Sequence, residues 1–152
     1  MKKILFLCAI LLLNAAVLTA AGKSKDDYIK DLSSDDPATV VAAEKYLGEK
    51  KEKSVVDKLT DLLQNASDKD VRMNAAVALG LIGEKKVIDT CIDQILVERN
   101  SDVRYALVLA VTRLGVETKA QGDKLVQVKE NETDPIIIDY LTKIEEKIKG
   151  KK

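Results

Sequence analysis

The chain contains no histidine, no tryptophan, a single phenylalanine and two cysteines among its 152 residues. Without histidine it cannot form the Ser-His and Cys-His pairs of nucleophilic enzymes, or most kinds of zinc site. A glycine-rich phosphate-binding loop is also absent, because Gly80 and Gly83 lie near the end of a predicted helix and not before a helix start. We therefore expect a protein that is not an enzyme and that holds neither a cofactor nor a metal ion.

Aromatic residues are so scarce, at 3% of the chain, that the core has to be built from Leu, Ile, Val and Ala. Small aliphatic side chains of this kind suit helices that pack closely against helices. Phe6 and Cys8 lie in the first 21 residues, which leaves Cys91 alone after them and excludes a disulfide within the remaining chain. Cys91 falls on an apolar stripe without a basic neighbour, so we interpret it as an inert core residue.

Residues 1–21 have the pattern of a secretory signal peptide. Two lysines precede an uncharged, mainly apolar run that ends in small residues. The alternative is a retained transmembrane anchor, for which this run is near the lower limit of length. We expect cleavage after Ala20 or Ala21, so that residues 22–152 form a single mature domain that is exported to a periplasm or secreted.

The balance of charge argues against nucleic acid as a partner. Lys and Arg number 25, as do Asp and Glu, and removal of the signal peptide leaves 23 basic and 25 acidic residues. A protein that binds nucleic acid needs a basic stripe to displace phosphate counterions. We expect the mature chain to bind neither nucleic acid nor, once the signal peptide is removed, a membrane.

A repeated helical pattern organises the rest of the sequence. In residues 68–83, Asp68 is a good helix N-cap, apolar residues recur at helical spacing, and Gly83 is placed to end the helix. The same device returns along the chain at a spacing of 32, 32 and 34 residues, at the caps Asp36, Asp68, Asn100 and Asp134. A helical unit of that length predicts a stacked solenoid.

We therefore predict an all-α fold, an α-solenoid of about four antiparallel helix pairs. The fourth pair begins with the weakest helix, whose thin apolar stripe includes Ala120 and which contains Gly122. The predicted pairs are residues 28–32 with 37–48, 54–66 with 69–82, 87–96 with 101–114, and 117–129 with 135–148.

Two runs of residues carry a resemblance to a known family. They are Asp70-Val71-Arg72, Ala75-Ala76, Ala78-Leu79-Gly80 and Gly83, and then Asp102-Val103-Arg104, Ala110 and Leu114-Gly115. This pattern resembles the HEAT repeat of the short bacterial type, often called the phycobilisome-lyase HEAT-like repeat. The likeness covers nearly all of residues 28–149, although the first and fourth repeats lack the Val-Arg pair. The resemblance implies an α-solenoid and, most commonly, a protein-binding scaffold, and it implies no single chemistry.

Arg72 and Arg104 each follow an aspartate by two residues. In proteins that this chain resembles, such residues usually help to set the packing of adjacent repeats. We interpret Asp70, Arg72, Asp102 and Arg104 as a structural ladder and not as a ligand site. Exposed ion pairs contribute little stability each, so we expect the ladder to fix register more than stability.

The second helices of the two central pairs are apolar nearly all round. A helical wheel places Met73, Ala76, Val77 and Gly80 opposite the core stripe, and Tyr105, Val108, Leu109 and Thr112 at the corresponding positions of the next repeat. The flanking helices carry charge there, as at Glu44 and Lys45. Two explanations stay open, namely that these residues line a partner-binding groove or that curvature makes neighbouring helices cover one another.

The leading hypothesis is an exported, non-enzymatic interaction scaffold that binds a partner protein or peptide on its concave helix face. Met73, Val77, Tyr105 and Leu109 are the candidate binding residues. One alternative is a HEAT-like lyase or chaperone-type enzyme subunit. The absence of histidine and the predicted core position of Cys91 both argue against it. Another is a homo-oligomeric structural protein that uses the same apolar face on itself.

Overall fold

The computed structural model describes residues 22–150, which form eight α-helices and two short 3-10 turns with no strand in that range. The predicted signal peptide, residues 1–21, lies outside the described residues. The helices are α2 (Lys25–Asp31), α3 (Pro37–Glu49), α4 (Val56–Asn65), α5 (Lys69–Ile82), α6 (Ile88–Val97), α7 (Ser101–Leu114), α8 (Lys119–Asn131) and α9 (Pro135–Lys149), and the 3-10 turns η1 (Lys53–Val55) and η2 (Lys85–Val87) precede α4 and α6.

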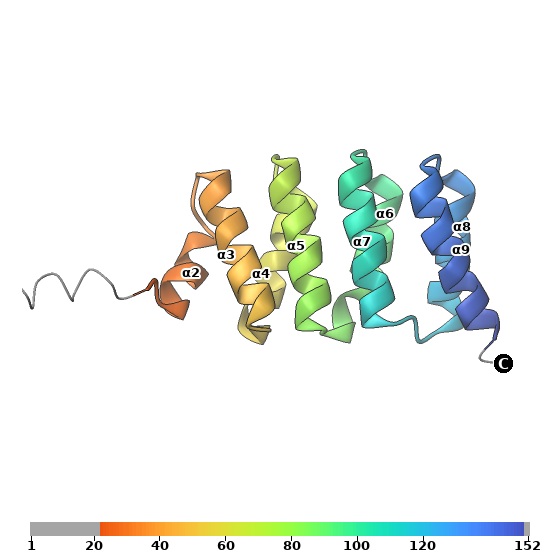
Figure 1. Ribbon diagram of the computed structural model, residues 1–152, viewed down its shortest axis with the longest axis horizontal. Coiled ribbons are helices and arrows are strands. Elements are labelled where there is room, and N and C mark those ends of the chain that lie inside the picture. Colours follow the sequence, from red (N-terminus) through yellow and green to blue (C-terminus); the bar gives the residue numbers. More distant parts are fainter. Residues whose placement is uncertain (1–21, 151–152) are drawn as a thin grey trace, which may run out of the picture.

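The helices form two layers that run the length of the molecule (Figure 1). The second helices of the pairs, α3, α5, α7 and α9, lie side by side in chain order, and α4, α6 and α8 lie behind them. Each second helix packs against the first helix of its own pair and against the second helices of its neighbours. The predicted all-α solenoid of four helix pairs is confirmed.

The four second helices begin at the predicted caps. Asp68 accepts hydrogen bonds from the backbone N–H groups of Asp70 and Val71 at 2.8 and 3.1 Å. Side-chain oxygens of Asp36, Asn100 and Asp134 accept from the first turns of α3, α7 and α9 in the same way. Gly83 ends α5 in the left-handed conformation, at a φ of 82°, which glycine adopts without strain. Local sequence therefore sets where each second helix starts.

The core between the two layers is aliphatic, as the composition predicts. Apart from Cys91, its buried apolar side chains are Leu, Ile, Val and Ala. The largest side chains that are almost completely buried are Leu32, Leu47, Leu59, Leu63, Leu79, Ile88, Ile92, Leu107, Ile137 and Leu141.

Neighbouring second helices approach each other closely through glycine. A Cβ atom added to Gly48 would lie 2.9 Å from the α-carbon of Ala78, and one added to Gly80 would lie 2.9 Å from the α-carbon of Ala110. Real Cβ atoms do not come so near another backbone. The backbones of α3, α5 and α7 can therefore pack in direct contact because these positions carry no side chain.

The first helix of the fourth pair differs from the prediction. Thr118 caps α8, so the helix starts two residues later than expected, and Ala120 is exposed in its first turn. Gln121 is buried instead, and its side-chain oxygen accepts from the N–H groups of Glu117 and Thr118 at 3.0 and 3.2 Å. This reciprocal capping box satisfies backbone N–H groups at the start of α8. The thin apolar stripe in the sequence did not predict it.

Candidate partner-binding site

The candidate binding residues lie on one face of the second-helix layer, the face of α3, α5, α7 and α9 that points away from α4, α6 and α8. We call it the second-helix face. Along each helix of this layer, some side chains turn toward the neighbouring second helix and others toward solvent. The two explanations left open by the sequence can therefore be judged position by position.

Neighbouring helices cover one set of these positions. Ala76 and Val108, which occupy equivalent places in α5 and α7, are both completely buried. Gly80 is buried as well, because Ala110 of α7 packs on it. The covering explanation holds for this set. It also holds for Glu44, the equivalent residue of α3. The helical wheel places Glu44 opposite the core stripe, but in the structure it has no exposed surface.

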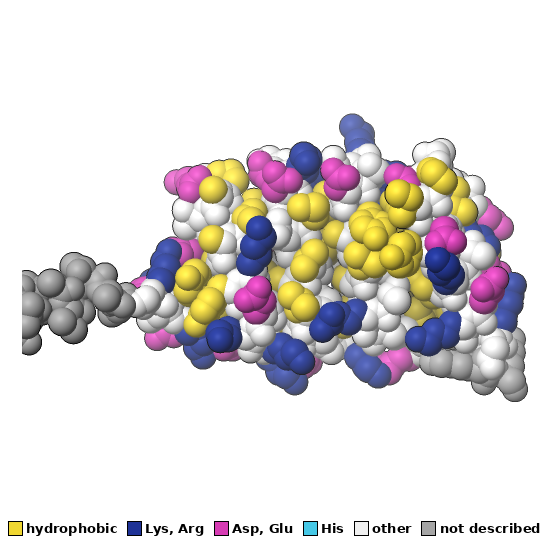
Figure 2. Space-filling view, in the orientation of Figure 1, with side chains coloured by type: hydrophobic (Ala, Val, Ile, Leu, Met, Phe, Trp, Pro, Cys, Tyr) yellow, Lys and Arg dark blue, Asp and Glu magenta, His cyan; other side chains and the backbone are white. Residues whose placement is uncertain are grey.

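A second set remains accessible. Val77 and Leu109 are 41% and 37% exposed, and Met73 and Tyr105 are partly buried. These four side chains belong to α5 and α7, and Figure 2 shows hydrophobic side chains gathered on this face, most densely near α7. The structure thus leaves all four candidate binding residues partly open to solvent.

Tyr140 of α9 extends this apolar surface, although the sequence did not single it out. Its ring contacts the ring of Tyr105 edge to face, with centroids 5.4 Å apart and an interplanar angle of 77°. The ammonium of Lys143 lies 5.6 Å from the centre of the Tyr140 ring. The offset of 34 residues aligns Tyr140 with Ala106, which is buried in the preceding repeat.

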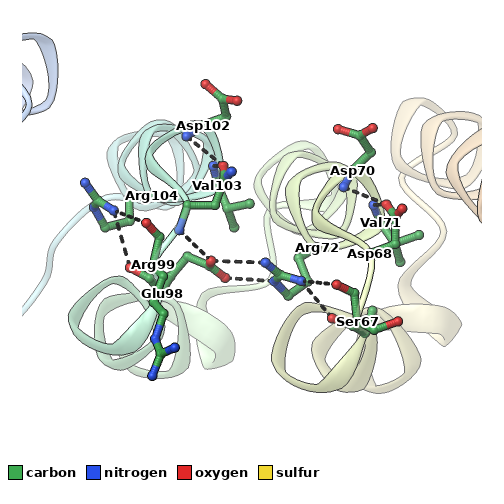
Figure 3. A network of polar contacts seen from close by, with 12 residues as sticks. Ser67, Asp68, Asp70, Val71, Arg72, Glu98, Arg99, Asp102, Val103 and Arg104 are labelled. Carbon is green, nitrogen blue, oxygen red and sulfur yellow. Dashed lines mark hydrogen bonds and ion pairs between the residues drawn. The ribbon is translucent and has the colours of Figure 1, made fainter.

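Arg72 makes a bidentate contact with the next repeat (Figure 3). Its Nε and Nη2 donate to the two carboxylate oxygens of Glu98 at 2.8 and 3.1 Å. Its Nη1 donates at 2.9 Å to the backbone carbonyls of Ala66 and Ser67, which directly follow α4. One guanidinium therefore joins the loop before its own helix to the loop before the next one.

Arg104 repeats this arrangement one unit later. Its Nε and Nη2 donate to Glu132 at 2.8 Å each, and its Nη1 donates to the carbonyl of Arg99 at 3.0 Å. The side chains of Glu98 and Glu132 are only 4% and 3% exposed. We call the two contacts together the Arg–Glu ladder.

Hydrogen bonds keep both ladder carboxylates ionised. Burial alone would raise the pKa of Glu98, but donation from Arg72 and from the Asn100 N–H outweighs it and lowers that pKa. Donation from Arg104 brings the pKa of Glu132 to about 2 against the same opposing effect of burial. These buried charges are paired, as such charges need to be.

Asp70 and Asp102 take no part in the Arg–Glu ladder. Their side chains are 57% and 65% exposed, and the ammonium of Lys69 lies 3.2 and 3.7 Å from their carboxylates. Glu98 and Glu132 serve in their place. Each of these glutamates stands two residues before a second-helix cap, a repeated position that sequence reasoning missed because it falls in a loop.

We searched the described part of the chain for metal-binding clusters, reactive thiols and membrane-spanning helices. Within residues 22–150, no three or more His, Cys, Asp or Glu side chains are grouped so as to hold a metal ion. Cys91 is completely buried, and burial raises the pKa of its thiol to about 12. No helix within the same residues is long and apolar enough to cross a membrane.

Comparison with known proteins gives one clear result. A family model described as HEAT repeats matches residues 26–112, which is more than half of the chain. A search of curated proteins finds no match. The matched residues run from α2 to near the end of α7, so they include the helices that carry the four candidate binding residues.

Proposed function

Since the chain belongs to the HEAT-repeat family, we propose that it is an exported, non-enzymatic scaffold that binds a partner protein or peptide on its second-helix face. HEAT repeats generally act as protein-interaction scaffolds. The observation that carries the proposal is the row of partly exposed apolar side chains across α5 and α7, namely Met73, Val77, Tyr105 and Leu109.

The free-energy cost of exposed apolar surface supports a binding role for this row of side chains. Apolar surface left in water costs about 25 cal/mol for each Å² that a partner could cover, so a contiguous apolar patch more often marks an interaction site than an accident. Tyr105 is the best anchor, because its ring offers a large apolar area and its hydroxyl can reach a polar group on a partner. The edge-to-face contact with Tyr140 also helps to hold the Tyr105 ring in position.

Within the family, we place the repeats with the short bacterial, phycobilisome-lyase-like type. The 32-residue spacing of the caps and the repeated Asp-Val-Arg sequence support this assignment. The N-terminal pattern supports export, with residues 1–21 removed. Intact-mass measurement of the protein from its native source tests export, because the mass of a chain that begins near Gly22 is expected. A full-length chain in the membrane pellet would mean an anchored protein.

Val77→Glu tests the proposed binding face. A carboxylate pressed into an apolar contact loses its water without gaining a partner, so we expect this substitution to abolish capture of the native partner by the purified protein. Leu96→Glu is a matched control, because Leu96 is also 41% exposed but lies on α6, in the other layer. Equal loss of capture in the two variants, or no loss in Val77→Glu, would refute the proposal.

A further inference from the structure

The centre of the second-helix face has a simple pattern of side chains. The residues at equivalent positions of α3, α5, α7 and α9 are Lys45, Val77, Leu109 and Lys143, at offsets of 32, 32 and 34 residues. Lys45 is exposed, and the Lys143 side chain is 65% exposed. Two accessible apolar residues therefore lie between two accessible lysines, and Figure 2 shows basic side chains toward both ends of the apolar surface.

The spacing of the helices sets the spacing of this pattern. Packed helices lie about 8–10 Å apart, and the glycine contacts of α3, α5 and α7 favour the short end of that range. A bound α-helix that crosses the layer advances about 10 Å in seven residues, which returns nearly to the same side of the helix. An extended strand covers that distance in about three residues, whose side chains point to opposite sides. A helix can thus place two residues on Val77 and Leu109, and a strand cannot.

We propose that the partner segment is an amphipathic helix with two apolar residues seven positions apart, preceded and followed at the same interval by acidic residues. This inference rests on the proposed function and names the class of partner. The acidic residues would lie over Lys45 and Lys143, while the apolar pair covers Val77 and Leu109. The Lys143 ammonium forms an ion pair with the Asp139 carboxylate of its own helix at 2.6 Å. Because this pair is exposed and weak, the ammonium can also bind a carboxylate of the partner.

A second copy of this chain fits the face less well. A two-fold axis through the middle of the pattern, between Val77 and Leu109, places each Lys45 opposite the other copy's Lys143. Like charges placed opposite each other across an interface oppose association. Acidic residues on a different protein remove this repulsion and replace it with attraction, so charge complementarity favours a separate partner.

Three synthetic helical peptides test the inference by fluorescence anisotropy with the purified protein. One carries Leu at two positions seven apart with Glu at both outer positions, the second has Lys in place of Glu, and the third has the same composition as the first in scrambled order. We expect the Glu-flanked peptide to bind about tenfold more tightly than the Lys-flanked one at low salt, and the difference to shrink in about 0.5 M salt. The scrambled peptide should bind weakest.

Lys45→Glu reverses one end of the pattern and is expected to remove most of the preference for the Glu-flanked peptide. Its matched control is Lys58→Glu, which makes the same change of charge on α4, where the side chain is 41% exposed. Val77→Glu should abolish binding of both the Glu-flanked and the Lys-flanked peptide.

The outcomes separate the inference from the proposed function. If the two flanked peptides bind equally and Val77→Glu abolishes both, the apolar site stands and the charge pattern is refuted. If no peptide binds while Val77→Glu still abolishes partner capture, the helical partner is refuted and the face remains a binding site. If no peptide binds and Val77→Glu leaves capture unchanged, both are refuted.

Discussion

The junction between α3 and α5 and the junction between α5 and α7 have the same backbone contact and different side-chain chemistry. Each brings a glycine of one second helix onto an alanine of the next, Gly48 on Ala78 and Gly80 on Ala110. At the equivalent buried position, however, the first junction contains Glu44 where the second contains Ala76. The packing of two helices therefore does not determine how polar their interface is.

The two junctions also differ in how buried carboxylates are satisfied. Glu98, in the loop beside the second junction, has Arg72 and a backbone N–H as donors. Neither carboxyl oxygen of Glu44 has a hydrogen-bond partner within the described residues. Burial, and to a lesser extent the charge of Asp68, raises the pKa of Glu44 to about 8. The same residue type thus stabilises one junction as an anion and is tolerated in the other chiefly as a neutral acid.

The largest expected effect is the pH dependence that Glu44 gives to the first junction. Its pKa rises from 4.5 when exposed to about 8 in the fold, so the contribution of Glu44 to stability is fully present below pH 4.5 and is lost as the pH rises toward 8. Within that window the loss accumulates at up to about 1.4 kcal/mol per pH unit. Glu44→Gln should abolish this part of the pH dependence and make the variant the more stable protein at pH 8.

Urea unfolding of both proteins at several pH values between 5 and 8 measures the effect, because all other titrating groups are common to the two chains. A constant difference in stability over this range would show that Glu44 is ionised throughout. The second junction provides the contrast. The pKa of Glu98 is lowered, so its contribution to stability is present above pH 4.5 and is lost on acidification.

The next effect concerns the Arg–Glu ladder. Arg72→Ala removes the guanidinium that donates to Glu98 and to two backbone carbonyls, and leaves the Glu98 carboxylate buried without its charged partner. We expect a loss of about 3 kcal/mol, the low end for breaking a buried pair, because 17% of the Arg72 side chain is exposed. Denaturation midpoints of Arg72→Ala and of the double variant Arg72→Met with Glu98→Leu measure it.

The double variant sharpens this comparison. Replacing both partners by apolar residues of similar volume leaves no stranded charge, so it should be more stable than Arg72→Ala. A double variant that is as unstable as the single one would mean that Arg72 acts mainly through the carbonyls of Ala66 and Ser67. The loss would then belong to the end of α4 and not to the contact between repeats.

Sequence predicted the parts of this architecture that depend on local chemistry. Caps such as Asp68 and the helical spacing of apolar residues depend on a few neighbours in the chain, and these were found with the correct period. A helical wheel also separated the core side of α5 from its other side. It could not tell that Ala76 is covered while Val77 is 41% exposed, because that depends on where α7 lies.

The ladder partners escaped prediction for a related reason. Arg72 and Arg104 belong to helices with a recognisable pattern, whereas Glu98 and Glu132 stand in loops, where repeats diverge most. The first two repeats carry Ser34 and Ala66 at the corresponding position, so only two of the four repeats show the glutamate. Contacts between residues about 26–28 apart, as here, become evident only when the repeats are stacked.

The smallest effect should come from the opposite edge of the solenoid, where Lys53 and Glu84 also join two repeats. Their ammonium and carboxylate lie 2.6 Å apart, but the Lys53 side chain is 72% exposed and that of Glu84 is 32% exposed. Donation from Lys53 lowers the pKa of Glu84, yet water solvates both groups well when the pair opens. Lys53→Ala should therefore leave the urea midpoint within experimental error, although Lys53 bridges repeats just as Arg72 does. A midpoint shift comparable to that of Arg72→Ala would show that bridging between repeats matters regardless of burial. The contrast between the Arg–Glu ladder and this exposed edge would then no longer hold.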